Sequence, residues 1–106
     1  MIKIKNKIST ETTNGKSINK ILGPLYVTNG SFSGEVNLQW DALQKANSYI
    51  IEISKNGSGW HQVDIVSDPQ YSMQGLKSGK SYSFRVSAVF SNGDCIKSSA
   101  ITKKIK

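Results

Sequence analysis

The sequence predicts an all-β protein, an antiparallel sandwich of short strands. Apolar and polar residues alternate with a period of two in several segments, which is typical of half-buried strands. No segment sustains the longer period of an amphipathic helix. Turn-forming residues separate the alternating segments, as they do in small sandwiches and barrels. The 106 residues are enough for one hydrophobic core and too few for two.

Residues 1–65 contain four expected strands. Residues 25–27 follow Pro24 and are expected at a sheet edge, where proline is tolerated. Two strands carry large apolar residues at alternate positions, which are Val36, Leu38 and Trp40 in one and Tyr49, Ile51 and Ile53 in the other. Residues 56–59, Asn-Gly-Ser-Gly, suit a tight hairpin because they tolerate positive φ, and residues 60–65 form the returning strand.

The rest of the chain contains three more expected strands. Tyr71 and Met73 mark a short strand that ends before Gly75. The strongest alternation spans residues 82–88, and residues 91–94 then turn the chain. Residues 96–102 are expected to form the last strand in one piece.

The ordered pattern resembles that of fibronectin type III domains. Its members are Trp40, Tyr49 with Ile51, Gly75-Leu76, Gly79 and the run from Tyr82 to Ala88. The resemblance covers roughly residues 24–104 and implies a seven-stranded antiparallel immunoglobulin-like β-sandwich with an extended N-terminal arm. Residues 1–22 are then a basic arm and linker, and residues 23–106 are the sandwich. The expected structural core comprises Trp40, Tyr49, Leu76, Tyr82, Phe84 and Val86. The Tyr82 hydroxyl is expected to bond to backbone near Leu76 or Lys77, as a tyrosine corner does.

The net charge of +7 is concentrated at the two ends of the chain. Residues 1–20 hold five lysines and one glutamate, or +4, and residues 97–106 hold four lysines and no acid, again +4. The residues between hold five basic and six acidic side chains, or −1. Nucleic-acid modules usually gather Lys and Arg on one folded face, and Arg85 is the chain's one arginine. We therefore expect no specific nucleic-acid binding, and we expect the basic ends to meet acidic protein surface.

The inventory of reactive side chains predicts no catalytic, metal or cofactor site. His61 is the one histidine and is expected to be an exposed residue of a hairpin strand. Cys95 is the one cysteine, which excludes an internal disulfide, and a buried or half-buried strand position is expected for it. Neither residue has the partners that a zinc site needs. Asp64 and Asp68 bracket a turn, and the chain is not expected to be an enzyme.

Two features could bind a partner. In the arm, Ile2, Ile4 and Ile8 alternate with Lys3, Lys5 and Lys7. Such a strand could add to an exposed sheet edge, either its own or that of a neighbouring copy. Trp60 and Phe32 could form an aromatic surface for sugars, although a tryptophan in such a hairpin more often covers the sandwich edge. Carbohydrate binding is therefore possible but not favoured.

The function expected from these features is that of a non-catalytic structural and protein-interaction module. The N-terminal residues are not expected to be a secretory signal peptide, because no apolar run follows their lysines, and no segment is expected to insert in a membrane. A phage virion accessory protein decorates a capsid or tail and is released by lysis. It could therefore carry a domain of extracellular type without an export signal. The alternative is an extracellular spacer or carbohydrate-associated module of a bacterial surface protein or glycosidase. Both place the domain in a virion or otherwise outside the cell, and this last step is an analogy from fold.

Overall fold

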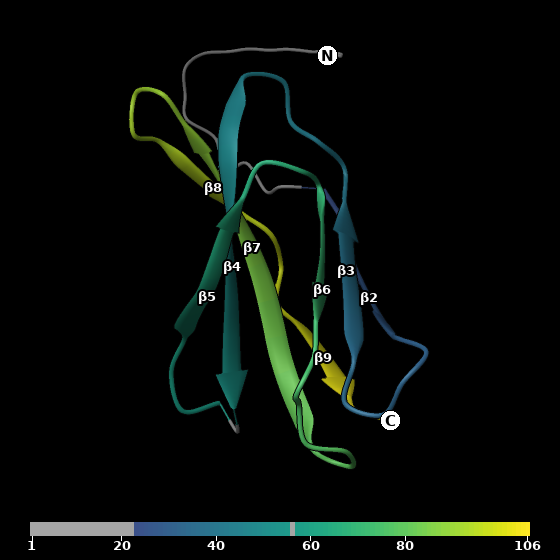
Figure 1. Ribbon diagram of the computed structural model, residues 1–106. Coiled ribbons are helices and arrows are strands. Elements are labelled where there is room, and N and C mark those ends of the chain that lie inside the picture. Colours follow the sequence, from purple (N-terminus) through teal and green to yellow (C-terminus); the bar gives the residue numbers. More distant parts are fainter. Residues whose placement is uncertain (1–22, 56) are drawn as a thin grey trace.

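The computed structural model describes residues 23–106 apart from Asn56, and its regular elements there are all strands (Figure 1). The predicted arm, residues 1–22, lies outside the described residues. No helix in the described part is long and apolar enough to cross a membrane. The eight strands are β2 (Leu25–Asn29), β3 (Val36–Trp40), β4 (Ala46–Lys55), β5 (His61–Val66), β6 (Gln70–Met73), β7 (Ser81–Phe90), β8 (Cys95–Lys97) and β9 (Ile101–Lys104).

Two antiparallel sheets face each other and confirm the predicted sandwich. One sheet has the order β2-β3-β6, and the other has the order β5-β4-β7, with β8 and β9 both paired to the far side of β7. The pairing of β4 with β7 is the longest, from the Ala46–Phe90 pair to the Lys55–Tyr82 pair. Loops that join the strands therefore gather at two opposite ends of the molecule (Figure 1).

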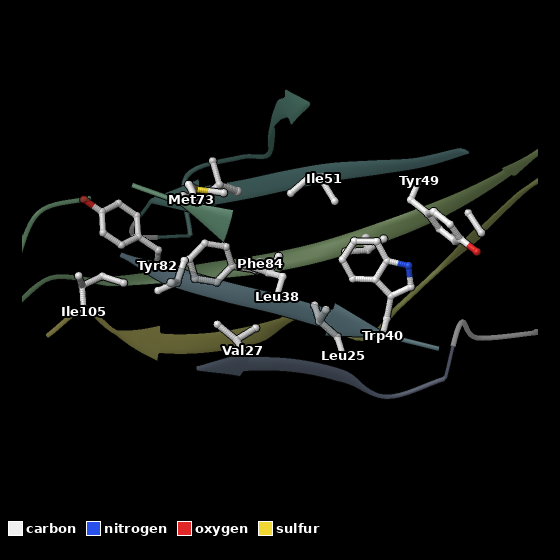
Figure 2. Packing of buried hydrophobic residues seen from close by; sticks show 14 residues of the cluster. Leu25, Val27, Leu38, Trp40, Tyr49, Ile51, Met73, Tyr82, Phe84 and Ile105 are labelled. Atoms are coloured by element: carbon white, nitrogen blue, oxygen red, sulfur yellow. The ribbon is translucent and has the colours of Figure 1, made fainter. Parts of the chain in front are cut away.

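The core lies between the sheets and uses alternate residues of each central strand. Val36, Leu38, Ile51, Phe84, Val86 and Ala88 have no exposed surface. Trp40 and Tyr49 pack edge to face near one end of the core, with ring centroids 5.4 Å apart. Figure 2 shows Tyr82 and Ile105 near the other end. Ile105 is 2% exposed, so the residue that follows β9 closes the core there.

Two tyrosine hydroxyls bind backbone at the opposite ends of the sandwich. The N–H of Lys77 donates to the Tyr82 hydroxyl at 3.0 Å, within the segment where a tyrosine corner was expected. The N–H of Leu43 donates to the Tyr49 hydroxyl at 2.9 Å. Each bond holds a loop against a strand of the five-stranded sheet and satisfies a backbone donor that would otherwise need water.

The last strand differs from the prediction, because β8 and β9 are separate. The register between β7 and this edge shifts by one residue between the Ser87–Lys97 and Phe84–Ile101 pairs. Ser98 causes the interruption. Its hydroxyl accepts the Val86 N–H at 3.0 Å, where a regular ladder would use a backbone carbonyl, and its own N–H donates to the Val86 carbonyl at 2.8 Å. The two pieces occupy one edge of β7 and together supply the predicted seventh strand.

Trp40→Ala should lower the free energy of unfolding by about 3–5 kcal/mol, because truncating a buried aromatic side chain leaves a cavity. Trp40→Phe should cost clearly less. It keeps an aromatic ring and removes the Nε1–H group, which is buried without a hydrogen-bond partner. Urea denaturation of both variants measures the difference. Equal losses would show that the indole does not fill the core as described.

Tyr82→Phe should lower the free energy of unfolding by about 1–3 kcal/mol, because the ring stays and the Lys77 N–H loses its acceptor. Tyr26→Phe is the matched control. Tyr26 is 55% exposed, so its variant should change stability by less than about 0.5 kcal/mol. If both variants unfold at the same urea concentration as the parent protein, the tyrosine-corner bond contributes nothing.

Candidate functional site

The aromatic surface predicted from the sequence is divided between the two sheets. Trp60 lies at the outer face of the five-stranded sheet, with the Arg85 guanidinium 4.1 Å from its ring centroid. Arg85 Nε in turn donates to Glu52 Oε1 at 2.7 Å, from the next strand. The Arg85 and Glu52 side chains are 24% and 19% exposed, so their ion pair contributes at most about 1 kcal/mol. Because Arg85 covers one of its faces, Trp60 is not an open platform.

Phe32 has an open ring. It lies in the loop between β2 and β3 of the other sheet and is 71% exposed. Its backbone N–H donates to Glu35 Oε1 at 3.2 Å, which orders the loop beneath it. Phe32 and Trp60 therefore do not form one surface, and Phe32 is the one that can stack on a ligand.

The outer edge of β5 is open among the described residues. β5 pairs with β4, and five of its six residues are exposed. Val63 and Ile65 are 37% and 52% exposed, and Asp64 between them is exposed as well. The register shift between Ile51 and Glu52 marks a bulge, which increases local twist. A six-residue edge offers unpaired backbone groups to another strand, while its bulge and the charge of Asp64 restrict which strands can pair there.

Two other edges, that of β6 and that formed by β8 and β9, are less suited to receive a basic strand. β6 has four residues and follows Pro69. The edge formed by β8 and β9 is interrupted and carries Lys97, Lys103 and Lys104. Like charges repel at such an edge, whereas Asp64 on β5 attracts lysine.

Asp64 also acts on Tyr71. The pKa of Tyr71 is raised above its usual value of 10.0, first because burial disfavours the phenolate. Hydrogen bonding with the Asp64 carboxylate and repulsion from its charge raise this pKa further. The two residues belong to β5 and β6, which are in different sheets, so the contact spans the side of the sandwich.

The histidine and the cysteine do not form a cluster with other reactive side chains in the described residues. His61 is exposed at the start of β5. Cys95 is exposed, so the expectation of a buried or half-buried cysteine was wrong. Cys95 begins β8 opposite Val89, directly after an exposed turn, and no second layer covers it there. Within residues 23–106, Asn56 aside, no three residues among His, Cys, Asp and Glu lie close enough to hold a metal ion.

One end of the sandwich holds a hollow of about 150 Å³ that sequence reasoning missed. It is lined by Lys55, Lys77, Lys80, Ser81 and Tyr82. Alternation predicted both β4 and β7, but it did not predict how they pair, and the register that sets Lys55 opposite Tyr82 brings the lysines together.

Comparison with known proteins identifies the sandwich. The family model for the fibronectin type III domain matches residues 24–104. The chain belongs to this family. No curated protein sequence matches it significantly. A solved Fn3-like protein from Clostridium thermocellum is 29% identical, with 74% of this chain and 84% of that chain covered and a TM-score of 0.66.

Two other solved structures share the fold at lower identity. The sixth fibronectin type III domain of a human fibronectin type III domain containing protein is 18% identical, with 87% of this chain and 90% of that chain covered and a TM-score of 0.72. A pectate lyase from Erwinia chrysanthemi, solved with tetragalacturonic acid, is 17% identical with a TM-score of 0.66. The similarity covers 74% of this chain and 27% of the lyase, so it concerns one part of that enzyme.

Domains of this family are generally non-catalytic structural or interaction modules. The candidate binding surfaces of this fibronectin type III domain are therefore the β5 edge, the exposed Phe32 and the lysine-lined hollow.

The Tyr71 hydroxyl should ionise above the usual tyrosine pKa of 10.0 in the folded domain. The folded-state pKa is the higher one, so the unfolded chain loses this proton first as the pH rises. The group's contribution to stability is therefore complete below pH 10 and is lost as the pH rises through the folded-state pKa. Asp64→Asn removes the neighbouring charge and should lower the Tyr71 pKa. Phenolate absorbance, compared between the parent and Tyr71→Phe proteins, measures it, and an unchanged pKa in Asp64→Asn would contradict the contact.

Proposed function

We propose that this fibronectin type III domain is a non-catalytic interaction module that joins a larger assembly by strand addition. The observation that carries the proposal is the open β5 edge with exposed Val63 and Ile65. The donor strand is the arm, residues 1–8, which alternates isoleucine with lysine. The arm of one copy would pair with the β5 edge of a neighbour, so that copies join head to tail.

The chemistry of the two segments is complementary. Consecutive residues of a strand point to opposite faces, so an added strand can place isoleucines beside Ile65 and lysines beside Asp64. Ordering the arm costs about 1–2 kcal/mol per residue, so backbone hydrogen bonds to the edge and burial of isoleucine must offset that cost. The β8 and β9 edge cannot serve equally, because its lysines repel the arm.

Two settings would use such a module. A phage capsid or tail, decorated by this domain as an accessory protein, is proposed from the arm and the fold. A bacterial surface protein or polysaccharide-degrading enzyme, with this domain as an extracellular spacer, is the alternative. The specific observations in its favour are the 29% identity with the Clostridium thermocellum protein and the similar sandwich within a pectate lyase.

Sedimentation velocity of the full chain should show association that increases with protein concentration. Ile2→Ser with Ile4→Ser should abolish it by removing apolar contacts of the donor strand, and Ile65→Lys should abolish it from the acceptor side. Tyr26→Ser is the matched control, because Tyr26 is exposed on β2, and its association should be unchanged. Salt should weaken association, since exposed charge pairs are screened.

Hydrogen exchange of the same samples completes the test. The amides of residues 2–8 should be protected in the parent chain and lose protection in the Ile65→Lys variant. A parent chain that stays monomeric, with these amides exchanging as fast as those of a free peptide, would refute strand addition.

A further inference from the structure

Lysines gather at one end of the sandwich, which we call the basic end. Of the eight lysines in the described residues, six lie there. They are Lys55, Lys77, Lys80, Lys103, Lys104 and Lys106. Figure 1 shows this end as the one where β4 finishes, β7 begins and β9 finishes.

Strand register places these lysines side by side although up to 51 positions separate them in the sequence. Tyr82 pairs with Lys55 of β4 on one side and with Lys103 of β9 on the other. Its neighbour Ser81 pairs with Lys104. Lys77 and Lys80 come from the loop between β6 and β7, and with Lys55 they line the hollow of about 150 Å³.

Hydrogen bonds hold the backbone of the basic end in place. The Gly34 N–H donates to the Lys106 carbonyl and the Leu76 N–H to the Gly34 carbonyl, each at 3.0 Å. Gly34 has a φ of +83°, and a Cβ there would lie 2.6 Å from the Leu76 carbonyl oxygen, so the junction requires glycine. The Ile105 N–H donates to the Lys80 carbonyl at 2.8 Å. The lysines are therefore presented from a preorganised backbone, which reduces the entropy that a ligand must remove.

Among the described residues, the loops at the opposite end of the sandwich carry mostly acidic side chains. Asp41, Asp68 and Asp94 lie in these loops with Lys45. At the basic end the acidic side chain is Glu35, which accepts the Phe32 N–H. Within the described residues, this separation of charge favours binding of an anion at the basic end.

Phe32 lies in the loop that contacts the Lys106 backbone and adds an apolar surface at the same end of the sandwich. It precedes Ser33, whose hydroxyl donates to the Lys106 carbonyl at 3.0 Å. The ring is 71% exposed. The face of an aromatic ring can stack on the apolar C–H face of a sugar.

We infer that the basic end binds an anionic polysaccharide, one that carries carboxylate, sulfate or phosphate groups along its chain. An acidic protein surface, which was expected above for the basic ends of the chain, fits this end less well, because protein interfaces favour apolar and arginine anchors and are depleted in lysine. Nucleic-acid sites use arginine and several stacking rings, whereas this end has one open ring and no arginine. Lysines beside a single aromatic platform suit a flexible charged glycan. The inference rests on this end alone and does not depend on the arm.

The test measures binding of the full chain to immobilised polygalacturonate and dextran sulfate, with neutral dextran and single-stranded poly-dT as comparisons. Lys77→Glu with Lys80→Glu should weaken binding to the charged glycans about tenfold or more and reduce its salt dependence. Lys45→Glu with Lys97→Glu changes the net charge equally, away from the basic end, and should stay within about twofold of the parent chain. Phe32→Ala should weaken glycan binding and leave the salt dependence unchanged. The two glycans distinguish carboxylate from sulfate as the preferred group.

Several results would overturn the inference. Equal weakening by the two charge-reversal pairs would show that net charge alone is responsible. Full binding by the Phe32→Ala variant would remove the sugar-specific contact. Tighter binding to poly-dT than to either charged glycan would assign the surface to nucleic acid. Circular dichroism and urea midpoints of each variant, matched to the parent, show that lost binding is not lost folding.

Discussion

The register of β7 is the constraint on which the other features of this domain depend. β7 is paired on both sides, and its inward residues Tyr82, Phe84, Val86 and Ala88 are at most 6% exposed. Side chains alternate along a strand, so a slip of one residue would turn these four residues to solvent and Arg85 into the core. The same register places Arg85 beside Glu52 and sets Tyr82 between two lysines. The register that packs the core thus also determines which side chains are neighbours on the surface.

The loops at the two ends are ordered from within the core. Tyr49 and Tyr82 each bury a ring between the sheets and bind a loop N–H through the hydroxyl. At the basic end, Ile105 and Gly34 add contacts that tie the residues after β9 to two other loops. A surface built on such loops keeps its shape without a ligand, because its backbone donors are already satisfied. This is how a small sandwich can hold the backbone that carries charged side chains in a fixed arrangement.

Most of the fold could be predicted from the sequence, because alternation depends on residues that are close along the chain. The inward positions of β3, β4 and β7 follow from it directly. The interruption at Ser98 could not be predicted, since it depends on a serine hydroxyl replacing a backbone carbonyl opposite Val86. The exposure of Cys95 depends on how far the facing sheet extends. The lysine cluster depends on pairing between strands that are distant in the sequence, and this pairing cannot be inferred from composition.

Some lysines of the basic end can have a role that requires no ligand, because they lie at a sheet edge. Lysines on an edge strand discourage pairing with other chains. That role accounts for Lys103 and Lys104, which belong to β9. It does not account for Lys77 and Lys80, which lie in the loop between β6 and β7. Two like charges around one hollow repel each other. A bound anion would relieve that repulsion. Binding of an anionic ligand therefore explains why these two loop lysines lie close together.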